Sequence, residues 1–212
     1  MPAARRAQLT RVSRGTQHVW VIYRVEPHVV WESGTTGGVP ANNSTARSFS
    51  SSHPVLAAMV ASGDVTVHNG PNPVAAWPAL RAALPAAKGA PRNESLMLGV
   101  FHTLRKSTGR YANYAYTFSA APPFAVRHVS ARLPTTEAEV RPGAETPRGA
   151  RMTFVSGLVE ALAPGKGDAV TGTHVLYGSS NSESRLLTLT TDELVALFTR
   201  ADAGVAARKK QR

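Results

Sequence analysis

Two runs of alternating apolar and polar residues, separated by a short polar turn, constrain the fold of this chain most. The runs cover residues 98–103 and 111–118, and residues 105–110 between them include Ser, Thr and Gly. Period-two alternation of β-branched and aromatic residues is typical of half-buried strands, and glycine with small polar residues closes turns. The segment therefore predicts a β-hairpin.

The same pattern recurs near the end of the chain. Residues 173–178 and 185–189 are largely apolar and flank a polar turn. Further apolar segments that fit strands cover residues 18–23, 27–31, 65–68 and 152–162. Serial hairpins of this kind predict an all-β fold built from antiparallel meanders, as in β-propellers.

One short helix is predicted to close the domain. Thr190 and Glu193 have the spacing of a capping box, in which a hydroxyl and a carboxylate satisfy free amides of the first turn. Leu194, Leu197 and Phe198 follow at the spacing of one apolar helix face.

Composition divides the chain into a central domain and two basic ends. We expect a disordered basic arm at residues 1–15, a β domain at 16–202 and a basic tail at 203–212. The Ala/Pro-rich stretch at 75–92 is interpreted as a surface insertion, although a short helix would also fit. The chain contains no cysteine, which excludes disulfides and cysteine nucleophiles. With no secretory leader and no apolar run of spanning length, a cytoplasmic or organellar location is the default expectation.

The net charge of +11 is concentrated at the two ends. Residues 1–15 and 203–212 carry four Lys or Arg each and no acid, which leaves about +3 for everything between them. Because nucleic-acid-binding domains spread positive charge over the folded body, we expect nucleic acid not to be the main partner. The alternative left open is a basic RNA- or ribosome-associated organellar protein that works through its ends.

Six short motifs occur in the order found in one family of carbohydrate-active proteins. They lie at residues 25–30, 68–74, 98–103, 116–124, 154–158 and 177–185. Together they resemble the five-bladed β-propellers of the β-mannoside phosphorylases and hydrolases, and their glycosyltransferase-associated relatives. Since a blade takes about 40–50 residues, the chain would supply about three blades, the C-terminal portion of such a propeller. It would then be a fragment, a truncated product or a degenerate relative.

The resemblance implies a site for an oligosaccharide or sugar phosphate, with inorganic phosphate as a co-substrate. No metal site is predicted, because the histidines fall on separate strands without a short ligand spacing. The substrate-binding residues that it implies are Glu26, His28, Asn72, His102, Tyr177, Glu183 and Arg185. Asn181 stands where the family pattern has an aspartate, and no residue matches the family's proton-donating aspartate. The catalytic residues therefore stay unassigned, and hydrolysis, phosphorolysis and loss of activity all remain open.

Most of these residues also have a simpler structural interpretation. Glu26 can pair with Arg24, the histidines can be hydrogen-bonded structural residues, and Glu183 with Arg185 can be an ion pair that holds the last hairpin. The alternative function is accordingly a non-catalytic propeller remnant that serves as an interaction surface. The open sheet edges of an incomplete propeller would also allow self-association or a partner.

Overall fold

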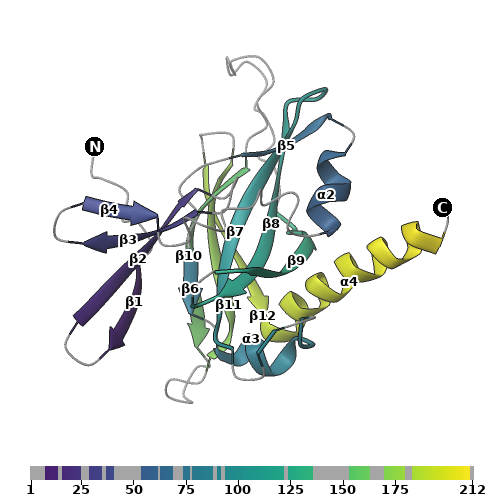
Figure 1. The fold of residues 1–212 in the computed structure, drawn as a ribbon. Coiled ribbons are helices and arrows are strands. Elements are labelled where there is room, and N and C mark those ends of the chain that lie inside the picture. Colours follow the sequence, from purple (N-terminus) through teal and green to yellow (C-terminus); the bar gives the residue numbers. More distant parts are fainter. Residues whose placement is uncertain are drawn as a thin grey trace.

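The computed structural model of the chain describes fourteen segments. They are residues 8–13, 16–24, 29–34, 37–40, 54–61, 63–68, 74–76, 78–87, 90–91, 94–121, 124–135, 153–162, 170–179 and 183–210. These residues form three antiparallel sheets and three helices (Figure 1).

The first sheet has four strands in sequence order and lies to one side of the other two (Figure 1). Its strands are β1 (Gln8–Ser13), β2 (Thr16–Arg24), β3 (Val29–Gly34) and β4 (Gly37–Pro40). The pairing of β2 with β3 confirms the strands predicted there. Strand β1 corrects the prediction of a disordered arm over residues 1–15, because it pairs with β2 from Gln8 to Ser13. Pairing uses backbone groups, so arginines do not prevent it at an edge strand.

The central sheet is built around the predicted hairpin. Its strands are β5 (Val65–His68), β6 (Val74–Ala76), β7 (Leu96–Arg105), β8 (Arg110–Ser119) and β9 (Val126–Arg132). The order is β5-β7-β8-β9, and β6 also pairs with β7. Strands β7 and β8 pair without a register shift from Leu96 opposite Ser119 to Arg105 opposite Arg110, which confirms the hairpin.

The third sheet contains the second predicted hairpin. Its strands, in sheet order, are β10 (Thr153–Leu162), β11 (Val170–Ser179) and β12 (Glu183–Thr190). The antiparallel all-β prediction is thus confirmed for the described residues. The finer prediction of a propeller is not confirmed by this arrangement.

The β7–β8 pair is buried on both faces. On one face Phe101, Tyr116 and Phe118 pack with Val55 and Leu56 of α2 (Pro54–Val60). The opposite face joins a second core with apolar residues of β10, β11 and β12. This second core also takes in α4 (Thr191–Lys210), which crosses below β9 (Figure 1). The central sheet is therefore an inner layer, and its near-continuous burial follows from having neighbours on both sides.

Helix α4 begins at the predicted capping box. The Thr190 backbone N–H donates to Glu193 Oε2 at 2.8 Å, and the Glu193 N–H donates to Thr190 Oγ1 at 3.2 Å. Leu194, Leu197 and Phe198 are buried as predicted. The helix is longer than expected, since its 20 residues extend to Lys210 and include most of the segment predicted as a tail.

The Ala/Pro-rich stretch at 75–92 is not a surface insertion. It contains β6 and helix α3 (Pro78–Ala83), and Leu80 and Leu84 are buried in the second core. Leu84 directly follows the helix, and its N–H donates to the Leu80 carbonyl at 2.9 Å, so the turn continues and both leucines lie on the same side. None of the helices that the structure describes combines the length and hydropathy that crossing a membrane requires.

Candidate functional site

The seven residues implied by the family resemblance do not all have a described position. Glu26, His28 and Asn72 lie outside the described residues. The other four are His102 on β7, Tyr177 on β11, and Glu183 and Arg185 on β12.

His102 lies in the interior of the protein. Its side chain is 3% exposed, and it stands opposite Asn113 in the β7–β8 register. The ring centroids of Phe154 and Tyr111 lie 4.9 Å and 5.6 Å from that of His102. Enclosure by two aromatic rings supports the structural interpretation of this histidine.

Three of the predicted residues meet on the third sheet. Tyr177 is the register partner of Arg185, and the Tyr177 hydroxyl is hydrogen-bonded to the Arg185 side chain. Arg185 Nη2 and Nε donate to Glu183 Oε2 at 2.8 Å and 2.9 Å. The bond to Glu183 raises the pKa of Arg185 above its ordinary value. The predicted ion pair between Glu183 and Arg185 is therefore present. The Tyr177 ring beside it is mostly buried.

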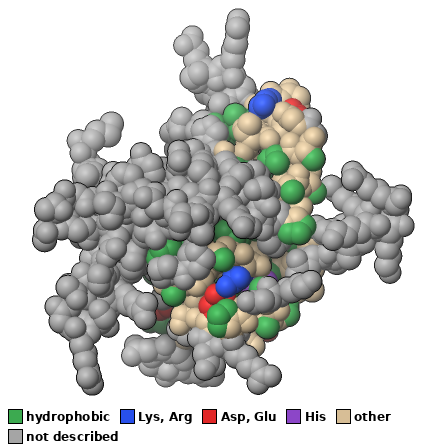
Figure 2. All heavy atoms as spheres, viewed as in Figure 1, with side chains coloured by type: hydrophobic (Ala, Val, Ile, Leu, Met, Phe, Trp, Pro, Cys, Tyr) green, Lys and Arg blue, Asp and Glu red, His purple; other side chains and the backbone are tan. Residues whose placement is uncertain are grey.

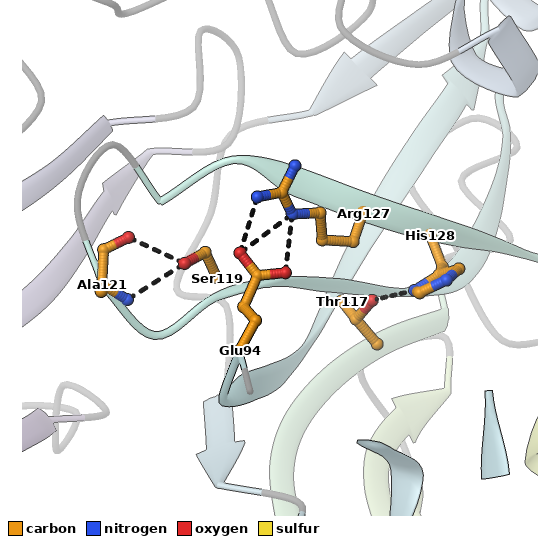
Figure 3. Close-up of polar contacts among 6 residues, drawn as sticks. All are labelled: Glu94, Thr117, Ser119, Ala121, Arg127 and His128. Atoms are coloured by element: carbon orange, nitrogen blue, oxygen red, sulfur yellow. Dashed lines mark hydrogen bonds and ion pairs between the residues drawn. The ribbon is translucent and has the colours of Figure 1, made fainter. Parts of the chain in front are cut away.

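A second set of polar contacts lies inside the protein. Asn113 Nδ2 donates to Thr153 Oγ1 at 2.8 Å and to Thr135 Oγ1 at 3.2 Å. Further along β8, Thr117 Oγ1 lies 2.7 Å from His128 Nδ1 (Figure 3). His128 Nε2 lies 3.0 Å from the Pro85 carbonyl oxygen. A carbonyl oxygen only accepts, so Nε2 carries the proton and Nδ1 accepts from the Thr117 hydroxyl.

The Thr117–His128 geometry is that of a hydroxyl next to a base, but it cannot serve a substrate. The Thr117 side chain is fully buried. A nucleophile must contact the reacting atom, which needs access from outside. The contacts instead attach the segment around Pro85 to β9.

An ion pair joins β9 to Glu94, which lies two residues before β7 and 33 residues from its partner Arg127. Arg127 Nη2 donates to Glu94 Oε1 at 2.6 Å, and Arg127 Nε donates to Glu94 Oε2 at 2.9 Å (Figure 3). The side chains are only 17% and 7% exposed. The sequence offered no local spacing that would have revealed this pair, because its members come from different elements.

The strongest concentration of exposed positive charge in the described body lies at the tip of the β7–β8 hairpin. Arg105, Lys106 and Arg110 are all exposed there. Figure 2 shows basic side chains next to an acidic one at the end of the molecule where Figure 1 places this tip. The sequence predicts a turn that contains these cations, but it does not predict the contacts that hold the turn.

Asp64, just before β5, holds the tip in one conformation. Its carboxylate accepts bonds from the Ser107 backbone N–H and hydroxyl, both at 2.8 Å, and from Arg105 Nη1 at 3.0 Å. Lys106 Nζ donates to the Gly63 carbonyl at 3.0 Å. The bonds from Ser107 lower the pKa of Asp64 below its ordinary value. The tip is therefore a braced turn that presents cations outward.

The described residues contain no group of three or more His, Asp or Glu side chains placed to hold a metal ion. No family model matches the chain, and neither a curated protein nor a solved structure matches it.

Proposed function

We propose that this chain is a non-catalytic binding protein that contacts the phosphate backbone of RNA through the β7–β8 hairpin tip. The observation that carries the proposal is the grouping of Arg105, Lys106 and Arg110 on one braced turn. Arg105 itself pairs with Asp64, as Arg127 and Arg185 pair with other carboxylates, so the net positive charge of the tip comes from Lys106 and Arg110. The folded body thus has a cationic site of its own at the tip, besides the positive charge at the two ends of the chain.

The chemistry of the turn favours a phosphate backbone over a lipid surface. Residues 106–109 are Lys, Ser, Thr and Gly, so the turn has no apolar side chain to insert between lipids. Lys and Arg with hydroxyl groups are the donors that contact phosphate oxygens in nucleic-acid complexes. The backbone contact alone gives affinity without sequence specificity.

The end of α4 supports the same proposal. Arg208, Lys209 and Lys210 form its last turn, and this part of the helix projects beyond the sheets (Figure 1). Cations are favourable at the negative end of a helix dipole, so the last turn can keep its helical form.

The salt dependence of RNA binding tests the proposal. Each phosphate contact on a single strand contributes about 0.7 to the slope of log K against log salt. Lys106→Gln with Arg110→Gln should therefore flatten the slope by about 1.4, which is about a sevenfold difference between roughly 50 and 200 mM salt. Arg105 is left in place because it also holds Asp64.

The matched control is Arg132→Gln with Arg200→Gln, which removes the same charge from two other exposed positions. Fluorescence anisotropy with a labelled single-stranded RNA of mixed sequence gives the slopes. The control should leave the slope close to that of wild type. Equal slopes for the tip variant and wild type would contradict the proposal, as would stronger binding to anionic vesicles than to RNA.

A second candidate function is glycan binding at Tyr177, Glu183 and Arg185, and it retains the prediction of an incomplete propeller of the β-mannoside phosphorylase type. It is favoured by the meeting of these three predicted residues. A ligand that binds only the folded chain raises the thermal midpoint. Mannose-type oligosaccharides, sugar 1-phosphates or phosphate should then raise it for wild type and not for Glu183→Gln. No shift with any of them would reject this candidate.

A further inference from the structure

Helix α2 separates two groups of positive charge. It contacts β5, whose first residue Val65 pairs with Arg105 at the base of the hairpin tip, and it also contacts α4. On α4 the contact region includes Ala201, which is buried in one core with Val55 and Leu56 of α2. From there α4 continues to its basic last turn, so α2 lies between that turn and the tip (Figure 1).

The exposed surface of α2 carries no charge. Ala57 and Ala61 are exposed one turn apart, and none of the residues from Pro54 to Ala61 is Lys, Arg, Asp or Glu. Figure 2 shows hydrophobic side chains on the face of the molecule below the charged tip. Asp64, which lies between α2 and the tip, is paired with Arg105. An anionic strand that crosses α2 would therefore meet no repulsive charge on the helix.

We infer that a single strand of RNA binds both cationic groups at once, with its backbone at the tip and at the end of α4 and its bases over α2. This rests on the proposed function, because it requires the tip to bind phosphate. The bases of a single strand are free to contact an apolar surface, whereas a duplex presents its charged backbone outward. One strand that joins two weak contacts makes the second contact intramolecular, which raises the affinity without any new contact.

The path between the two groups sets the length of RNA that reaches both. From Ala201 to Lys209, α4 rises about 12 Å, and helix axes in contact lie about 8–10 Å apart, so the end of α4 is about 15 Å from α2. Helix α2 adds about 6 Å from Leu56 to Val60, and the chain from Val60 to Asp64 adds at most about 14 Å. The whole path is therefore at most about 40 Å.

A strand stacked at about 3.4 Å per nucleotide covers this path with about 12 nucleotides, which defines the long RNA of the test. The short RNA has about 4 nucleotides and covers only about 14 Å, so it reaches the tip or the end of α4 but not both.

Fluorescence anisotropy with labelled single-stranded RNAs of mixed sequence tests the inference. The helix-end variant combines Arg208→Gln, Lys209→Gln and Lys210→Gln. In this variant only the number of binding registers grows with RNA length. The gain in affinity from the short to the long RNA should therefore be at least about tenfold larger for wild type than for the helix-end variant.

A charge placed on α2 tests the path itself. Ala57→Glu adds a negative charge at an exposed position, and Ala57→Gln is the matched neutral control, since both residues are good helix formers. At low salt, Ala57→Glu should weaken binding of the long RNA at least about threefold and leave binding of the short RNA nearly unchanged. Ala57→Gln should change neither.

Three results would overturn the bridge and leave binding at the tip in place. They are an equal gain with length in wild type and the helix-end variant, equal binding of the long RNA by Ala57→Glu and Ala57→Gln, and a duplex of the same length that responds to Ala57→Glu as strongly as the single strand. If Lys106→Gln with Arg110→Gln binds RNA of every length as wild type does, the proposed function itself is contradicted.

Discussion

Replacing Gly99 with alanine tests the packing of the central sheet most sharply. Gly99 stands opposite Tyr116 in the β7–β8 register, and the tyrosine ring covers the glycine. A Cβ at position 99 would lie 2.6 Å from Tyr116 Cε1 and 2.8 Å from Cζ. The ring would have to retreat by roughly 1 Å to restore ordinary contact.

The tyrosine has little room to move. Tyr116 is fully buried, and its ring centroid lies 5.5 Å from that of Phe118 and 5.9 Å from that of Phe101. Overpacking a close-packed core costs about 1–3 kcal/mol, and the lower chain entropy of unfolded alanine offsets about 0.5–1 kcal/mol. The net loss in the free energy of unfolding should be about 1–2 kcal/mol.

Urea unfolding followed by far-UV circular dichroism measures this loss. Gly178→Ala is the matched control, because the nearest atom to a Cβ there is the Glu183 carbonyl oxygen at 3.9 Å. That variant should be unchanged or slightly more stable than wild type. In a Tyr116→Leu background, Gly99→Ala should cost much less, since the smaller side chain gives the new methyl group space. A Gly99→Ala variant as stable as wild type, with additive effects in the double variant, would refute this reasoning.

The remaining predictions concern polar contacts that hold separate elements together. Arg127→Met should lower the free energy of unfolding by about 3 kcal/mol, since it leaves the mostly buried Glu94 carboxylate unpaired. Adding Glu94→Gln to this variant should recover part of the loss measured by urea unfolding. Losses from the two substitutions that simply add would contradict this prediction. The hydrogen bond from the Thr190 N–H lowers the pKa of Glu193 in the folded chain. The ionised Glu193 side chain therefore stabilises the fold above the ordinary glutamate pKa, and this stabilisation is lost as the pH falls through the lowered pKa. The thermal midpoints of wild type and Glu193→Gln should accordingly differ at neutral pH and converge in acid. Asp64→Asn should speed hydrogen exchange at the hairpin turn, because the carboxylate is its brace; unchanged exchange would show that the turn does not need it.

Local pairing explains why the hairpins could be predicted from the sequence. Both strands of the β7–β8 hairpin and the turn between them are contiguous in the chain, so alternation and turn chemistry specify the pairing. The capping box at Thr190 and Glu193 is equally local. The ion pair of Glu183 with Arg185 was accessible for the same reason, since residues two apart in a strand lie on the same side.

Contacts between distant segments explain what the sequence could not provide. Alternation tells which residues share a face, but it does not tell which faces meet, and so the layering of three sheets did not follow from it. Helix α3 was only the alternative to a surface insertion, because Leu80 and Leu84 gain their burial from distant parts of the chain such as α4 and β7. The brace from Asp64 to Ser107 spans 43 residues and has no local pattern either. The sequence predicts that the hairpin turn contains these cations, whereas it does not predict the contacts from Gly63 and Asp64 that hold the turn.

Crosslink mapping on RNA tests most directly whether the β7–β8 tip contacts nucleic acid. The full chain would be irradiated with a photoactivatable single-stranded RNA, digested, and analysed for nucleotide adducts by mass spectrometry. We expect adducts in the turn from Arg105 to Arg110, and their loss in the Lys106→Gln, Arg110→Gln variant while Arg132→Gln, Arg200→Gln retains them. Adducts confined to other parts of the chain, or equally strong in both variants, would contradict binding at the tip.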